Sequence, residues 1–228
     1  MGVYNDRGVT GTSSVSRATA DGHVMDLRMT RDGTPFTAEW VLGLCMEGRV
    51  FCGQAGLLTT PITWTATAVN DQTKPAMFLS VPSGTTVIPL EISLYMEAYG
   101  TSAQFECEAL TGTGAVSAGG SACAITNMRT DAPFTSNCTM TSDITGGTAP
   151  TANISAFWRD GEQFAITKSA GSATVAVHDP IKWVWKWTDS LYVPVIVGPA
   201  QLLVTQGSQA GTGFGKIIFV EIPSTSVA

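Results

Sequence analysis

Apolar residues alternate with polar ones across residues 90–109, and this period of two constrains the fold more than any other feature of the sequence. The alternating apolar positions are Leu90, Ile92, Leu94, Met96, Ala98, Phe105, Cys107 and Ala109. A Gly-Thr-Ser turn at 100–102 separates the two halves. Because successive side chains of a strand point to opposite faces, the pattern predicts a β-hairpin over residues 90–110 with one apolar face. We expect Ile92, Leu94, Phe105 and Cys107 to be buried on that face.

Similar strand patterns recur along the chain, whereas no window sustains a long amphipathic helix. Further predicted strands are Val24–Met29, Thr37–Cys45, Ile62–Ala68, Ala76–Val81, Ala124–Arg129, Gln163–Thr167, Ala173–His178, Ile181–Trp187, Pro194–Thr205 and Lys216–Ile222. Residues 39–46 also fit a short helix. Many short strands separated by Gly, Pro, Asn and Asp predict an all-β fold, a jelly-roll-like antiparallel β-sandwich over residues 23–228. Residues 1–22 contain few apolar side chains and predict an extended N-terminal arm. Residues 112–120 and 146–153 are expected to be exposed loops.

Charged residues make up only 13% of the chain, and its formal net charge is −6. This is about half the roughly 25% typical of soluble domains. Nucleic acids and anionic membrane surfaces require clustered Lys and Arg, which are scattered here, so neither is an expected partner. Low charge fits a surface covered by neutral hydroxyls or by other subunits, because charged residues are depleted at the centres of interfaces.

Neither a membrane span nor a secretory signal is expected. No apolar run reaches the roughly 18 residues that span a bilayer, and the first 17 residues lack the apolar core of a signal peptide. The five cysteines, an odd number without a CxxC pair, are therefore predicted to be free, buried thiols. They are Cys45, Cys52, Cys107, Cys123 and Cys138. No zinc site, other metal site or cofactor is expected, since neither His23 nor His178 lies near a cysteine pair.

No residue pattern indicates a catalytic site, and we expect the chain not to be an enzyme. A Ser-His-Asp arrangement could use only His23 or His178, both of which adjoin turn residues, and no G-x-S-x-G elbow is present. Residues 211–216, GTGFGK, superficially resemble a phosphate-binding loop, but Ala210 and Ile217 break its pattern. A β-hairpin loop is the expected structure there.

Carboxylates occur in pairs along the sequence. Glu106 and Glu108 share one face of a predicted strand, as the carboxylates of a glycosidase would. The other pairs are Glu91 with Glu97 and Asp131 with Asp143. On a half-exposed strand, this spacing is typical of a solvated face.

Trp183, Trp185 and Trp187 fall on one face of one predicted strand. If exposed, they would form a platform for stacking sugars; if buried, they would pack between two sheets or under a neighbouring subunit. The sequence leaves core, interface and glycan contact open. Asn137-Cys-Thr and Asn153-Ile-Ser match the N-glycosylation pattern, but without a secretory signal we do not expect them to be modified.

Three stretches carry a resemblance to a known class of proteins. They are VPSGTTVIPLEISLYMEAYGT (81–101), MRTDAPFTS (128–136), and the ending with PVIVGPAQLLV (194–204) and FVEIP (219–223). The chain resembles β-sandwich virion proteins of tailed phages, the capsid cement or decoration proteins. This resemblance implies a structural protein on the capsid exterior, assembled in the host cytoplasm, which forms a homotrimer and contacts the major capsid protein. It supplies no catalytic, cofactor-binding or metal-binding residue.

The arm at residues 1–22 fits such a role, because it could reach about 70 Å if fully extended and so tie neighbouring subunits together. Two other classes of function stay open. One is a carbohydrate-binding or receptor-binding β-sandwich of a phage tail or fibre that uses the tryptophan row. The other is a glycoside-active enzyme that uses Glu106 and Glu108. A jelly-roll major capsid protein is a variant of the structural hypothesis.

Overall fold

The computed structural model describes residues 39–64, 71–99, 104–114, 119–163, 181–207 and 211–226. The chain divides into two units at Glu47. The predicted arm, its boundary at residue 23 and the strands predicted at 24–29 and 173–178 lie outside the described residues, as does 164–167 of the strand predicted at 163–167.

The first unit contributes one described element, the helix α1 (Trp40–Met46). The amide of Gly43 donates to the carbonyl of Glu39 at 2.9 Å, and that of Glu47 to Gly43 at 3.1 Å. The strand predicted at 37–45 is therefore wrong, and the short helix weighed as its alternative is present. Nearly every position of the sequence WVLGLCM is apolar, so its pattern has no period that could distinguish a strand from a helix.

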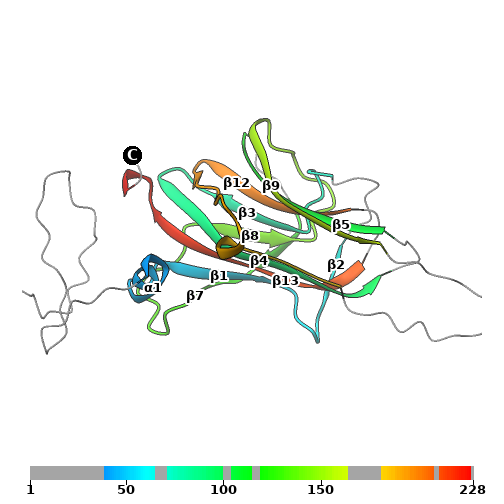
Figure 1. The fold of residues 1–228 in the computed structure, drawn as a ribbon, viewed down its shortest axis with the longest axis horizontal. Helices are drawn as coiled ribbons and strands as arrows, with labels where there is room; N and C mark the ends of the chain where they lie inside the picture. The colour runs from blue at the N-terminus through cyan, green and yellow to red at the C-terminus, as the bar shows by residue number, and fades with distance from the viewer. Residues whose placement is uncertain are drawn as a thin grey trace, which may run out of the picture. The chain divides into compact units, whose positions relative to one another are not determined.

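The second unit folds into two antiparallel sheets that pack face to face (Figure 1). In sheet 1 the strand order is β10-β4-β13-β1-β7, with β11 paired to β4 and β2 paired to β13. Its strands are β1 (Val50–Ala55), β2 (Ile62–Trp64), β4 (Thr85–Tyr99), β7 (Ile125–Asn127), β10 (Ile181–Lys186), β11 (Ile196–Val197) and β13 (Gly211–Pro223). The all-β antiparallel sandwich is thus confirmed.

Sheet 2 has the strand order β6-β8-β3-β12-β5-β9. Its strands are β3 (Met77–Val81), β5 (Gln104–Thr113), β6 (Ser121–Cys123), β8 (Thr139–Ser142), β9 (Ala152–Gln163) and β12 (Ala200–Gly207). Two short 3-10 helices complete the described elements, η1 (Trp187–Asp189) and η2 (Ser224–Ser226). The core lies between the sheets, and the four side chains predicted to be buried there, Ile92, Leu94, Phe105 and Cys107, are indeed buried.

The hairpin predicted over residues 90–110 is wrong as a pairing, although both of its strands exist. β4 belongs to sheet 1 and β5 to sheet 2, so the chain crosses from one sheet to the other between them. The inward side chains of the two strands therefore meet across the core instead of lying side by side. An alternating pattern fixes which face of a strand is buried, but a strand that continues in the same sheet and one that crosses to the facing sheet carry the same pattern.

The β-hairpin loop predicted at 211–216 is also wrong, because these residues are strand. Residues 206–207 end β12 in sheet 2, and β13 begins at Gly211 in sheet 1, so the phosphate-loop-like residues 211–216 lie within a strand. A side chain at Gly213 would collide with the carbonyl oxygen of Tyr95 on β4. The glycines of this segment let two backbones approach closely within a sheet, which is a recognised role of glycine in strands.

Replacing Ile92 with Asp tests the core. Ile92 is fully buried between the sheets, so an unpaired charge there should lower the free energy of unfolding by about 4 kcal/mol or more. Chemical denaturation followed by circular dichroism would measure the change. The matched control is Gln54→Asp on the exposed face of β1, which should change stability by less than about 0.5 kcal/mol. Similar losses for both variants would contradict this placement of the core.

Candidate functional site

The most exposed large hydrophobic side chains gather in two segments of the second unit. Among the described residues, the five most exposed are Leu191 (95%), Tyr192 (85%), Leu58 (73%), Leu57 (57%) and Val195 (54%). Single exposed apolar residues are ordinary, whereas clusters of them mark interaction sites. We name the two segments the β1–β2 tip (residues 56–61) and the apolar loop (residues 190–197).

The β1–β2 tip is a tight turn that the backbone holds in place. Leu57 and Thr60 exchange two backbone hydrogen bonds of 3.0 Å, which leaves Leu58 and Thr59 at the turn. Gly56 has a φ of +70°, and a Cβ atom there would lie 2.9 Å from the carbonyl oxygen of Gly213 on β13. The base of the tip is thus fixed against sheet 1, while the tip itself projects away from both sheets (Figure 1, cyan segment between β1 and β2).

The apolar loop leaves sheet 1 after β10 and returns to the same edge at β11. β10 pairs with β4 as far as Lys186 opposite Glu91, and β11 pairs with β4 from Ile196 opposite Val87. Ile196 is buried, and Val193 packs against the core. These anchors hold the backbone while the side chains of Leu191 and Tyr192 extend into solvent.

Pro89 lies at the break between β10 and β11. Neither strand pairs with residues 88–90 of β4, and the register of β4 with β13 shifts between Ile218 and Phe219, opposite Pro89. Proline has no N–H group to donate to a neighbouring strand, so it favours an interruption or a bulge in a sheet. Because residues 88–90 of β4 are left without a partner on this edge, the apolar loop can leave the sheet here between β10 and β11.

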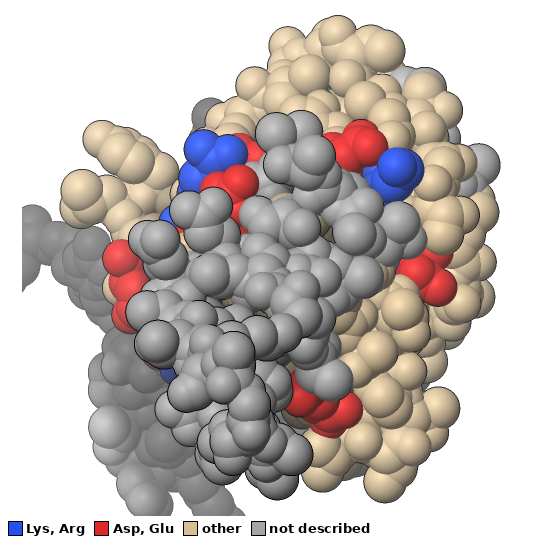
Figure 2. Space-filling model, turned by 90° about the vertical axis from the view of Figure 1, so that its right-hand side faces the viewer, with Lys and Arg blue, Asp and Glu red and all other residues tan. Residues whose placement is uncertain are grey.

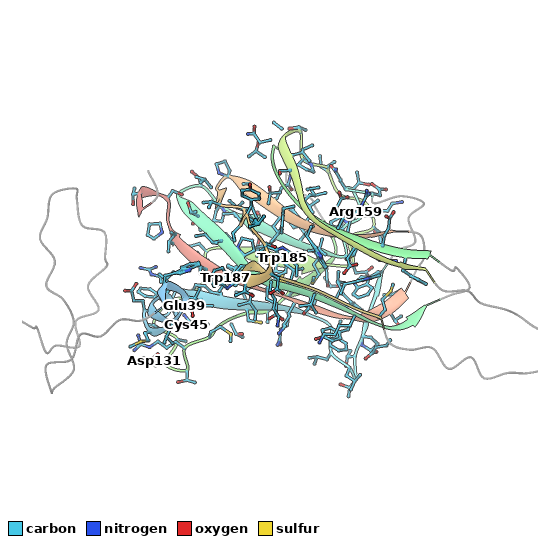
Figure 3. All side chains as sticks on the ribbon, in the orientation of Figure 1. Glu39, Cys45, Asp131, Arg159, Trp185 and Trp187 are labelled. Carbon is cyan, nitrogen blue, oxygen red and sulfur yellow. The ribbon has the colours of Figure 1, made fainter. Side chains whose placement is uncertain are left out.

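The tryptophan row belongs mostly to the core. Trp183 and Trp185 are 1% and 4% exposed, and Trp187 is half-buried at the start of η1. Phe157 of β9 meets Trp185 edge to face, with ring centroids 5.2 Å apart, and so links sheet 2 to sheet 1. Figure 3 shows Trp185 and Trp187 at neighbouring positions in the ribbon. Of the three readings left open by the sequence, packing between the sheets is confirmed for Trp183 and Trp185, which offer no ring face to a sugar.

The paired carboxylates do not converge on a site. Glu106 forms an ion pair with Arg159 (labelled in Figure 3) at 3.8 Å on the partly exposed face of sheet 2. In sheet 1, the ammonium group of Lys216 donates a 2.9 Å hydrogen bond to the carboxylate of Glu91, and this hydrogen bond raises the pKa of the lysine. Burial raises the pKa of Asp143. Glu106 and Glu91 are thus held in ion pairs in different sheets, and Asp143 lies apart from both of them in sequence and surroundings.

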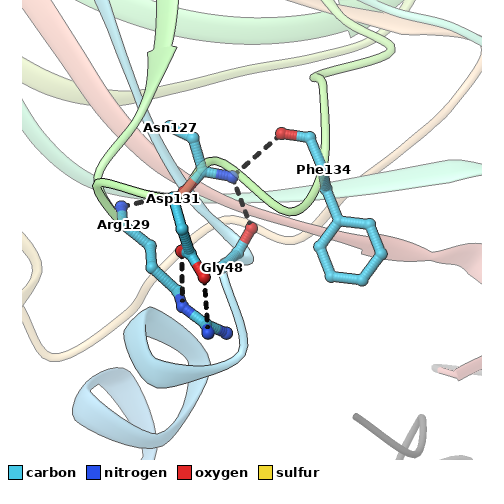
Figure 4. Close-up of polar contacts among 5 residues, drawn as sticks. All are labelled: Gly48, Asn127, Arg129, Asp131 and Phe134. Atoms are coloured by element: carbon cyan, nitrogen blue, oxygen red, sulfur yellow. Dashed lines mark hydrogen bonds and ion pairs between the residues drawn. The ribbon is translucent and has the colours of Figure 1, made fainter.

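Asp131, the partner expected for Asp143, instead closes a local loop (Figure 4). The guanidinium of Arg129 meets its carboxylate through two contacts of 2.8 Å. The side-chain amide of Asn127 donates to the carbonyl oxygens of Gly48 and Phe134, each at 2.9 Å. These contacts fix the stretch 128–136 that carries part of the resemblance, and they serve to hold a loop.

Glu221 is a buried carboxylate that the sequence analysis did not single out. It accepts hydrogen bonds from the hydroxyl of Ser136 at 2.5 Å, the backbone amide of Asn137 at 3.0 Å and the Asn137 side chain at 2.8 Å. Burial, with Glu221 beside it, raises the pKa of the Cys138 thiol. The carboxylate holds residues 136–138 against β13. The side-chain amide of Asn137, which belongs to one of the two N-glycosylation patterns, is thus hydrogen-bonded to the carboxylate of Glu221.

All five cysteines lie within the described residues and are free, as expected from the sequence, but only Cys52, Cys107 and Cys138 are buried, whereas Cys45 and Cys123 are partly exposed. Burial raises the pKa of Cys52, Cys107 and Cys123 as well as that of Cys138. His23 and His178 fall outside the described part of the chain. Within that part, no group of three or more His, Cys, Asp or Glu side chains is placed to hold a metal ion.

Comparisons with protein-family models, with curated proteins and with solved structures found no match. Over the ranges that the structure describes, no helix combines the length and apolar character needed to cross a membrane.

Thiol titration tests the state of the cysteines. Under denaturing, non-reducing conditions, five thiols per chain should react. In the native protein at pH 8, alkylation should be slower than for a free cysteine and should accelerate as the pH rises, because a raised pKa lowers the fraction of reactive thiolate. A denatured chain with only one reactive thiol would overturn this assignment.

Truncating Glu221 tests its role in holding the 136–138 loop. Glu221→Ala should lower the free energy of unfolding by about 3 kcal/mol, because it removes the hydrogen bonds that Ser136 and Asn137 donate to a buried carboxylate. Glu91→Ala, which removes a more exposed ion pair, is the matched control and should cost less than about 1 kcal/mol. Urea denaturation of both variants would measure the difference, and equal losses would contradict the assignment.

Proposed function

We propose that this chain is a structural virion protein, a capsid cement or decoration protein that stabilises a phage shell through contacts between subunits. One observation carries the proposal: the most exposed apolar side chains sit on two segments whose backbones are anchored to a β-sandwich. An interface formed by such segments costs little conformational entropy, because their shape is set before binding.

The charge of the molecule supports the same role. Only 13% of the residues are charged, and among the described residues visible in Figure 2 the acidic and basic side chains lie in small groups in which both signs occur. Burying a neutral surface avoids the cost of taking unpaired charges out of water. The expected partners are the major capsid protein and further copies of this chain, on the exterior of the virion.

The alternative function, binding of carbohydrate by a tail or fibre component, loses its main support in the structure. It relied on an exposed tryptophan row, and two of the three rings are in the core. The glycosidase hypothesis relied on Glu106 and Glu108 together, and the carboxylate of Glu106 is paired with Arg159. Neither alternative has another observation in its favour.

Sedimentation with capsid shells tests the proposal. The chain should co-sediment with undecorated shells assembled from the major capsid protein encoded in the same genome. A chain that leaves such shells undecorated at saturating concentration would overturn the proposed function.

Deleting residues 1–20 tests the contribution of the arm to that attachment. The shortened chain should bind shells at least about tenfold more weakly, a loss of about 1.4 kcal/mol. Its melting temperature should change little, because the sequence of residues 1–22 contains few apolar side chains. The unchanged melting transition serves as the folding control, and unchanged decoration by the shortened chain would count against the arm.

A further inference from the structure

The β1–β2 tip and the apolar loop lie on opposite sides of sheet 1. β1 and β2 pair with one edge of β13, whereas β10 and β11 pair with the far edge of β4, which is itself next to β13. Along the strands, the tip adjoins Gly213, while the loop lies level with Phe219, which pairs with Pro89. About six residues of extended strand separate these levels, a distance of roughly 20 Å.

The two surfaces are chemically compatible. No charged residue occurs between Arg49 and Asp71, the window that contains the tip, or between Asp189 and Lys216, the window that contains the loop. Contact between them would bury the leucine side chains of the tip against Leu191 and Tyr192, and neither segment contains a charged residue of its own. Tyrosine is enriched among the residues that dominate binding energy, and exposed Thr59 and Thr60 of the tip offer hydroxyl groups as partners for its phenol.

Two different apolar surfaces on opposite sides of one subunit favour a head-to-tail assembly. A two-fold dimer would bury both segments only if both faced the same partner, so their position on opposite sides of the β4–β13 pair favours a head-to-tail contact instead. In a closed ring, the tip of each copy meets the loop of the next, and both segments are buried in every subunit. We propose that this chain assembles as a ring in which the β1–β2 tip of one copy packs on the apolar loop of its neighbour. The inference rests on the homo-oligomer in the proposed function and names its contacts.

Two complementary variants of the full chain test the ring. The tip variant carries Leu57→Ser and Leu58→Ser, and the loop variant carries Leu191→Ser and Tyr192→Ser. The control variant carries Met128→Ser and Ile154→Ser, two side chains that are about half exposed elsewhere in the second unit. All the substituted side chains are exposed, so circular dichroism and melting temperatures should match those of the parent chain.

Sedimentation velocity in the absence of shells provides the readout. The parent chain and the control variant should sediment as a closed oligomer, three copies being the number that the resemblance implies. The tip variant and the loop variant should each sediment as monomers. Their equimolar mixture should form a one-to-one dimer, because the intact tip of one variant can dock on the intact loop of the other while the remaining ends are blocked. The dimer fraction should exceed that of either variant alone by at least about tenfold.

Several results would overturn the ring. One is a variant that still dimerises alone, since this indicates a two-fold contact through the surviving segment. Another is a mixture that forms no dimer, and a third is a monomeric parent chain. Shell binding is measured separately: a parent chain that forms rings but leaves shells undecorated refutes the capsid function and leaves the ring intact.

Discussion

The pairing of β4 with β13 is the contact on which the rest of the second unit depends. The two strands run antiparallel from Thr85 opposite Pro223 to Tyr99 opposite Gly211. Every other strand of sheet 1 except β7 pairs directly with one of them. Glycine at 213 and 215 lets the backbones and their neighbours approach, since a Cβ atom at either position would press on a carbonyl oxygen of β4. Changes in this pairing would therefore alter both edges of the sheet at once.

Both apolar segments arise in the same way from this central pair. Each is an excursion between two short strands that follow one another along a single edge: β1 and β2 along β13, and β10 and β11 along β4. A segment that leaves an edge and returns to it is fixed at both ends by ladder hydrogen bonds. Its tip can then present leucine or tyrosine side chains in a set direction, which is a requirement for a specific neutral contact.

The alternating pattern predicted most strands of the core but not their partners. For β4 and β5, the buried faces were correct and the pairing was wrong, because the sequence says which side of a strand is apolar and not which sheet contains it. Of β9, only the last residue, Gln163, fell within a predicted strand. The register of β9 with β5 shifts twice, and such shifts interrupt the alternation of side chains by which a strand is recognised in a sequence. The apolar loop was not predicted, because residues 194–205 form one apolar run in the sequence and so resemble a single strand. In the structure, Gly198 separates β11 from β12 within this run. A Cβ atom at Gly198 would collide with the carbonyl group of Pro82. Glu221 gave no signal, because its donors lie more than 80 residues away in sequence.

The position of β13 in the chain also has a consequence for biosynthesis. β13 is the last strand in chain order, yet it occupies the middle of sheet 1. Val50 of β1 pairs with Val220 of β13, which lies 170 residues later in the sequence. Until β13 has been synthesised, β1 therefore lacks its neighbour on the β13 side. Such long-range pairing is slow, and it leaves apolar strands without their cover on a nascent chain. A polypeptide that ends before residue 211 would have no β13 with which β1 and β2 could pair, so the β1–β2 tip would lack the strand that fixes its base.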